Sequence, residues 1–138
     1  MKNQQDNKNG KKKLASEWFA KAGDDELSAR DILKDREGAA STVCFLSQQM
    51  GEKYLKGYLV YQEKSFPKIH QLDRLVKLCE KLDADFAKIM GEAEYLTGFY
   101  VATRYPGEYP QFSFEEAKEA IERAIKIKDF VLEKVFKV

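Results

Sequence analysis

Residues 39–61 read AASTVCFLSQQMGEKYLKGYLVY, and this stretch decides the fold class. It contains no proline, and its apolar side chains fall on nearly every side of a helix: Val43, Cys44, Phe45, Leu46, Met50, Tyr54, Leu55, Tyr58 and Leu59. A helix that is apolar almost all round usually lies at the centre of a bundle. The stretch therefore predicts a central helix that other helices must surround.

Four further stretches have the apolar spacing of amphipathic helices. The first is expected over residues 16–34, the third over 72–82, and the fourth over about 83–103, starting at either of its first two aspartates. The last helix opens at residues 113–116, SFEE, which form a capping box. Because no stretch has the pattern of a strand, we predict an all-α fold, a single five-helix, up-and-down bundle.

The length and charge of the chain fit one domain with a real core. It has 138 residues, 43% of them hydrophobic, and we expect a disordered basic tail over residues 1–13 followed by the bundle over 14–138. The 24 Lys and Arg residues nearly balance the 23 Asp and Glu residues, for a net charge of +1. Binding to nucleic acid must therefore depend on a local basic patch.

Several classes of function are disfavoured by what the sequence lacks. Cys44 and Cys79 fall inside helical patterns without metal-site spacing, so we expect two buried thiols and no bound metal. Phosphate-binding loops, dinucleotide-binding glycine motifs and nucleophile elbows are missing, and we expect no cofactor. No apolar run approaches the roughly 18 residues of a membrane span, and no signal peptide is recognisable, so we expect a cytoplasmic protein without membrane contact.

Polar residues interrupt two helix faces where packing favours apolar ones. Asp25 lies on the apolar stripe of the first helix, where it either meets a cation or opens to a cleft, or else is half-exposed at the rim. Gln48, Gln49 and Glu52 interrupt one face of the central helix. They are candidates for a binding site and equally for a satisfied structural network.

His70, in the segment PKIHQL, is the only histidine. A single histidine before a helix is more often a capping or packing residue than a catalyst, but His70 stays a weak catalytic candidate.

Arg104 ends the predicted fourth helix at a loop containing proline and glycine, flanked by Tyr105, Tyr109 and Phe112. A guanidinium beside aromatic rings suits phosphate and base recognition. The alternative is an arginine that closes the last carbonyls of its helix.

One pairing would satisfy both Asp25 and Arg104. Arg–carboxylate contacts are favoured because two parallel hydrogen bonds can form. We therefore predict that these side chains lie within salt-bridge reach, directly or through Gln49 or Glu52, beside a concave surface.

The sequence resembles the HEPN domain family over residues 18–135. The resemblance is carried by W-x3-A-x2-D-x3-A-R at residues 18–30, CFLSQQMGEKYLKG at 44–57, PKIHQL at 67–72 and RYP at 104–106, with an alanine-rich last helix after them. The order and spacing of these pieces make the resemblance specific.

The resemblance implies a helical bundle that often forms a homodimer with its working groove between subunits. Many HEPN proteins are metal-independent ribonucleases, commonly toxins paired in a toxin–antitoxin system with a nucleotidyltransferase partner. Their motif is an arginine, four to six residues, and a histidine, and one branch carries a tyrosine that the partner modifies with AMP. Another branch was proposed to bind nucleotides, and the R-Y-P form resembles that branch.

This sequence departs from the ribonuclease motif at its histidine. Arg104 matches the arginine, but Tyr109 occupies the position after four intervening residues, and Gln111 stands where the modified tyrosine would be. A phenol with a pKa near 10 transfers protons poorly at neutral pH. The resemblance therefore favours a nucleotide- or RNA-binding module that acts with a separately encoded minimal nucleotidyltransferase.

In this interpretation Arg104 holds phosphate and Tyr105 or Tyr109 stacks on a base. Asp25 and Glu52 orient the arginine or a ribose hydroxyl. One alternative is a ribonuclease toxin with a degenerate site, in which Arg104 stabilises the scissile phosphate while His70 or Tyr109 transfers protons. A second alternative is a purely structural partner domain.

Overall fold

The computed structural model describes residues 4–102 and 111–137, and it is all-α over these ranges, as predicted. Its helices are α1 (Gln4–Asp35), α2 (Ala40–Tyr61), α3 (Leu72–Glu80), the 3₁₀ helix η1 (Ala84–Ile89), α4 (Met90–Thr97), α5 (Phe99–Ala102) and α6 (Phe114–Phe136). The short η1, α4 and α5 together form the fourth member of the predicted five-helix bundle. Within the described ranges no helix has the length and hydropathy to span a membrane.

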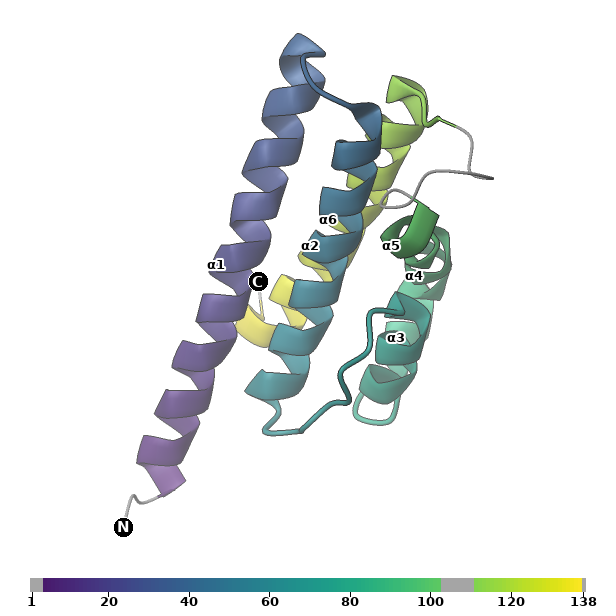
Figure 1. Cartoon of the computed structure of the whole chain (residues 1–138). Coiled ribbons are helices and arrows are strands. Elements are labelled where there is room, and N and C mark those ends of the chain that lie inside the picture. The colour runs from purple at the N-terminus through teal and green to yellow at the C-terminus, as the bar shows by residue number, and fades with distance from the viewer. Residues whose placement is uncertain (1–3, 103–110, 138) are drawn as a thin grey trace.

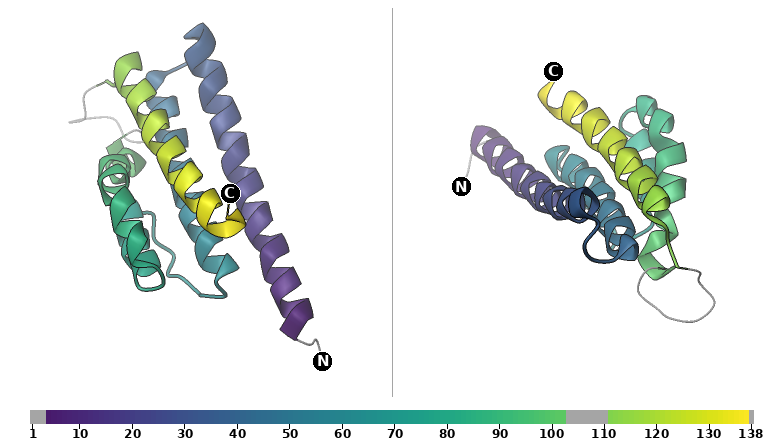
Figure 2. Two further views of the ribbon diagram at one scale, coloured as in Figure 1. Left: turned by 180° about the vertical axis from the view of Figure 1, so that it is seen from behind. Right: turned by 90° about the horizontal axis from the view of Figure 1, so that it is seen from above.

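The central helix is α2, as its composition predicts. In Figure 1 it lies between α1 on one side and α3 to α5 on the other, and the view from behind in Figure 2 shows α6 packed across its far face. Two glycines allow this close packing. A Cβ atom on Gly57 would lie 2.5 Å from Cε1 of Phe19, and one on Gly51 would lie 2.6 Å from Cδ2 of Leu72.

The first helix begins earlier than the sequence indicated. It starts at Gln4 rather than near Ser16, so the lysine-rich segment expected to be a disordered tail continues the helix. The lysines and glutamines of this segment are good helix formers, and they outnumber the weaker helix formers Asp6, Asn7, Asn9 and Gly10.

The predicted fourth helix is interrupted. Asp83 caps η1, because its Oδ1 accepts a hydrogen bond from the backbone N–H of Asp85 at 3.0 Å. The chain then passes into α4, which ends at Thr97 with Gly98 as its C-cap, and into the single turn of α5. The capping box of the last helix is confirmed: the Glu116 N–H donates to Ser113 Oγ at 3.0 Å and the Ser113 N–H donates to Glu116 Oε1 at 3.2 Å.

The connection between α2 and α3 positions the candidate site. Residues 62–71 return along the bundle, so that α3 begins beside the middle of α2 (Figure 1). Thr97 of α4 fixes the start of α3, because its Oγ1 accepts hydrogen bonds from the N–H groups of Leu72 at 3.1 Å and Asp73 at 3.3 Å. His70 therefore lies against the face of α2 that carries Glu52.

Candidate functional site

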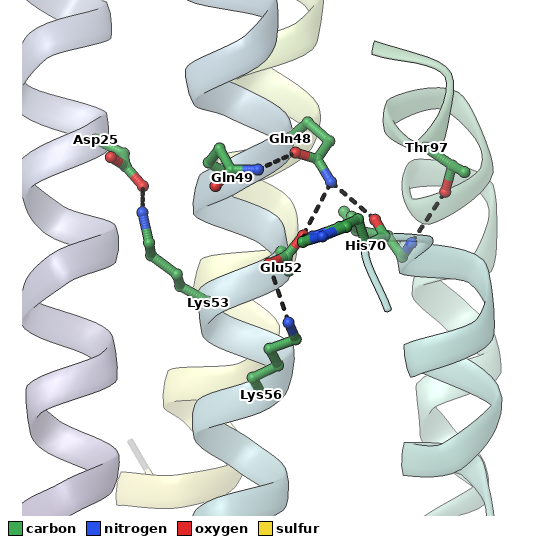
Figure 3. Close-up of polar contacts among 9 residues, drawn as sticks. Asp25, Gln48, Gln49, Glu52, Lys53, Lys56, His70 and Thr97 are labelled. Atoms are coloured by element: carbon green, nitrogen blue, oxygen red, sulfur yellow. Dashed lines mark hydrogen bonds and ion pairs between the residues drawn. The ribbon is translucent and has the colours of Figure 1, made fainter. Parts of the chain in front are cut away.

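Glu52 is the centre of a buried polar network on α2. Its side chain is 7% exposed, and its oxygens contact three groups: Nδ1 of His70 at 3.0 Å, Nζ of Lys56 at 3.1 Å and Nε2 of Gln48 at 3.3 Å (Figure 3). An ionised carboxylate only accepts hydrogen bonds, so the ring proton of a neutral His70 belongs on Nδ1. That arrangement leaves Nε2 as the acceptor nitrogen of the ring.

The two glutamines extend this network along α2. Gln48 is fully buried, and its Nε2 also donates to the backbone carbonyl of His70 at 2.8 Å. Gln49 donates from its Nε2 to Oε1 of Gln48 at 2.6 Å. Among the described residues every buried side-chain nitrogen or oxygen has a hydrogen-bond partner. The network therefore holds both the ring and the backbone of His70 in a fixed position.

His70 stacks on an aromatic ring that the sequence analysis missed. The centroids of His70 and Tyr100 are 4.1 Å apart and their planes differ by 10°. The His70 side chain is 44% exposed. Tyr100 belongs to α5, and the centroid of its ring also lies 6.3 Å from that of Phe45. Tyr100 falls within the fourth helix predicted from the sequence, and its position four residues before Arg104 was the available signal.

This aromatic pair borders an open depression of about 670 Å³. The depression is lined by residues from the 62–71 connection, α3, α4 and α5: Lys68, Ile69, His70, Gln71, Arg74, Thr97, Gly98 and Tyr100. Lys68 and Arg74 are exposed cations at its edge. The depression thus combines flat rings with positive charge, which suits a ligand that carries an aromatic base and a phosphate.

Asp25 lies on the opposite side of α2 from His70 (Figure 3). Its Oδ2 accepts a hydrogen bond from Nζ of Lys53 at 2.5 Å, and the Asp25 side chain is 15% exposed. Burial raises the pKa of Asp25, and the bond from Lys53 offsets only part of that shift. The cation beside Asp25 is therefore a lysine of α2. The predicted partner Arg104 lies outside the described residues, as do Tyr105 and Tyr109.

Glu26, which the sequence analysis did not single out, is the most buried acid on α1 among the residues whose side chains the structure describes. It accepts hydrogen bonds from Arg30 Nε at 2.7 Å and from Lys128 Nζ of α6 at 2.9 Å. Burial alone would raise the pKa of Glu26, but the bonds from Lys128 and Arg30 outweigh it and hold the pKa below its ordinary value. Its i,i+4 spacing to Arg30 was the signal in the sequence.

Metal-ligating groups are not gathered in the part of the chain that the structure describes, where no three His, Cys, Asp or Glu residues could hold an ion. Cys44 and Cys79 are buried free thiols, as expected. Burial raises the pKa of each to about 12, so both remain protonated and unreactive at neutral pH.

Comparisons with known proteins agree with this architecture. The family model of the HEPN domain matches residues 15–135. The chain is similar to the crystal structure of TT1696 from Thermus thermophilus, with a TM-score of 0.77 and 30% identity over 87% of this chain and 97% of that one. It is also similar to the crystal structure of ST0689, an archaeal HEPN homologue, with a TM-score of 0.71 and 29% identity over 88% and 97% of the two chains. No curated protein matches the sequence. Because the family model covers nearly the whole bundle, the chain belongs to the HEPN domain family.

Proposed function

We propose that this HEPN protein binds a nucleotide or RNA in the depression beside His70 and Tyr100. The observation that carries the proposal is the stacked ring pair at the edge of a cavity with two exposed cations, Lys68 and Arg74. Its rings offer apolar contact to a base, and its cations offer charge to a phosphate. Glu52 and Gln48 act indirectly, by fixing the position of His70.

Residues that follow α5 complete the proposed site. Arg104 and Tyr105 come four and five residues after Tyr100 in the sequence, and Tyr109 follows in the same segment. Arg104 would hold phosphate with its planar fork, and one of the tyrosines would stack on the base. Asp25 is paired with Lys53 on the opposite side of α2 and does not line this depression, so the proposed site does not include it.

Ligand binding can be tested by calorimetry with AMP, GMP and a short single-stranded RNA. His70→Ala and Tyr100→Leu should each weaken binding by about tenfold, since stacking on one ring contributes roughly 1–3 kcal/mol. Lys68→Gln should also weaken binding, because it removes one of the two cations of the depression. Lys77→Gln, at an exposed lysine of α3 outside the depression, is its matched control and should bind like the wild type. If the wild type binds none of these ligands at millimolar concentration, the nucleotide-binding proposal fails.

A metal-independent ribonuclease is the second candidate, and one observation favours it. Glu52 holds Nδ1 of His70, which leaves Nε2 oriented as a proton acceptor beside the cationic depression. We expect weak or no cleavage of RNA by the isolated protein, because the usual histidine after Arg104 is missing. Metal-free cleavage in EDTA that His70→Ala abolishes would place the ribonuclease first.

The partners are also proposals. The family resemblance supports a cytoplasmic homodimer whose interface uses the first or the last helix and places Arg104 near the two-fold axis. It also supports action with a separately encoded nucleotidyltransferase in a toxin–antitoxin-like pair. Light scattering should give twice the chain mass at micromolar concentration, and a monomer there would contradict the dimer. Association with a nucleotidyltransferase without any ligand binding would instead support a structural partner domain.

A further inference from the structure

A second depression lies on the α1–α6 side of the bundle. It has a volume of about 490 Å³ and shares no residue with the depression beside His70. Its lining comes from the last part of α1, the turn after it and the first half of α6: Arg30, Leu33, Lys34, Arg36, Phe114, Lys118, Ile121, Glu122 and Ile125. Figure 2 shows from behind that α6 crosses obliquely and comes closest to α1 toward its C-terminal end, so that the two helices diverge on the way to the start of α6.

Two contacts lie toward the two ends of this groove. One is the bond between Glu26 of α1 and Lys128 of α6, and the other is the guanidinium of Arg36, just after α1, 5.4 Å above the ring of Phe114. Ten residues separate Glu26 from Arg36, which at the helical rise of 1.5 Å per residue is about 15 Å. That length accommodates roughly three turns of a helix.

The floor of the groove is aliphatic and its rim is basic. Ile121 is buried at the base, and Leu33 and Ile125 remain partly exposed beside it. Four of the lining residues are cations and Glu122 is the only acid among them. In a chain whose net charge is +1, this is a local concentration of positive charge.

The lining residues suit a peptide better than a nucleic acid. Asparagine, glutamine, serine, threonine and tyrosine are absent from the lining, so few side chains offer hydrogen-bond acceptors to a base edge. The only aromatic ring of the lining, Phe114, is covered by Arg36. Aliphatic side chains, in contrast, match the partner leucines and isoleucines of helix-in-groove recognition.

We propose that the α1–α6 groove is the docking site for an acidic amphipathic helix of a partner protein. Leucine or isoleucine side chains at i, i+3 and i+7 of that helix contact the floor formed by Leu33, Ile121 and Ile125. Its aspartates and glutamates lie against Lys34 and Lys118 at the rim. The groove can be occupied while the depression beside His70 stays open, because the two share no residue.

A model peptide tests this site without knowledge of the natural partner. The probe is an 18-residue helical peptide with leucines along one face and glutamates beside them, titrated into ¹⁵N-labelled full-length protein. Its control is a peptide of the same composition whose leucines do not line up. We expect the aligned peptide to shift the amide signals of Leu33, Ile121 and Ile125 and to bind at least tenfold more tightly than the scrambled one.

Charge reversal then locates the contact. Lys34 and Lys118 are exposed, so Lys34→Glu with Lys118→Glu should keep the helix content, and it should weaken peptide binding by about tenfold. Lys64→Glu with Lys77→Glu gives the same change in net charge away from the groove and should bind like the wild type.

Four results overturn the proposal. In the first, the aligned and the scrambled peptide bind equally tightly. In the second, the aligned peptide shifts amide signals outside the groove. In the third, a short RNA shifts the groove signals at lower concentration than the aligned peptide does, and the groove is then a polyanion site. In the fourth, reversal at Lys34 and Lys118 changes the mass of the protein alone, and the groove is then an interface between two copies of this chain.

Discussion

Glu52→Gln tests whether the network behind His70 is as strongly coupled as its geometry indicates. The substitution keeps the shape of the side chain but removes the charge that faces Lys56, whose side chain is only 8% exposed. Removing one partner of a buried ion pair costs about 3–5 kcal/mol. The amide oxygen of the new Gln can still accept one hydrogen bond, which recovers about 1 kcal/mol. We therefore expect the free energy of unfolding to fall by about 2–4 kcal/mol.

The chain offers a matched control for this change. Glu119 and Arg123 form an ion pair with the same i,i+4 spacing, at 2.9 Å, but their side chains are 48% and 32% exposed. Surface pairs contribute about 0–1 kcal/mol, so Glu119→Gln should lower stability by less than about 1 kcal/mol. The comparison separates the effect of burial from that of losing any carboxylate on a helix.

A second substitution identifies the cause of the loss. Lys56→Met in the Glu52→Gln background removes the unpaired charge and should restore stability to within about 1 kcal/mol of the wild type, because neutral replacements of buried ion pairs are often tolerated. Urea unfolding followed by circular dichroism and by the fluorescence of Trp18, the only tryptophan, gives these free energies. If Glu52→Gln costs no more than Glu119→Gln, or if Lys56→Met lowers stability further, the reasoning about a stranded lysine is wrong.

Three more substitutions test the packing, the electrostatics and the ligand site. Gly57→Ala should destabilise by about 1–3 kcal/mol in urea unfolding, because its Cβ would clash with Phe19, whereas Gly91→Ala, with nothing within 4 Å, should stabilise by about 0.5–1 kcal/mol. Glu26→Gln should lower the free energy of unfolding at pH 7. The difference from the wild type should shrink as the pH falls below 4.5, the ordinary pKa of a glutamate, because the stability that comes with the lowered pKa of Glu26 is lost when the native carboxylate is protonated. A difference that does not depend on pH would contradict this. Arg104→Lys should weaken nucleotide binding in calorimetry while leaving the unfolding transition unchanged, because lysine keeps the charge but loses the planar fork; unchanged affinity would exclude a bidentate contact.

Local patterns in the sequence were sufficient for the central helix and the helix ends that have strong caps. The all-round apolar composition of residues 39–61 predicts α2 to within a residue, and Ser113 with Glu116 predicts the start of α6. These features depend on neighbours within a few residues. The interruption of the fourth helix at Gly98 was missed, because glycine inside an amphipathic pattern is compatible with both a continuing and a broken helix.

Side-chain burial on α1 was harder to predict, because it depends on which helices pack against it. The sequence analysis placed Asp25 on the apolar stripe of the first helix. In the structure Ala22 and Ala29 are buried on this stripe, while Trp18 is partly exposed at its edge. Asp25 is partly buried and paired with Lys53 of α2, whereas the neighbouring Glu26 is paired with Lys128 of α6, so α1 packs against two helices and buries more than one stripe.

The candidate site itself depends on contacts between residues far apart in the sequence. His70 and Glu52 are 18 residues apart, and Tyr100 comes 30 residues after His70. The three meet because residues 62–71 return along α2 and because Thr97 fixes the start of α3. Neither feature has a pattern that a single sequence reveals, so His70 was ranked as a capping or packing residue.

Glu52 and Gln48 link the stability of the bundle to the geometry of the site. The contacts that satisfy these polar groups inside the bundle are also the contacts that fix the ring and the backbone of His70. A network with this double role is sensitive in both respects, because a group left unpaired in the interior costs stability and also releases the ring it was holding. Of the two interpretations weighed for the polar face of α2, the structural network is observed, and the binding site that we propose depends on the same residues. Glu52→Gln with Lys56→Met separates them, since it should restore most of the stability while leaving His70 without its carboxylate.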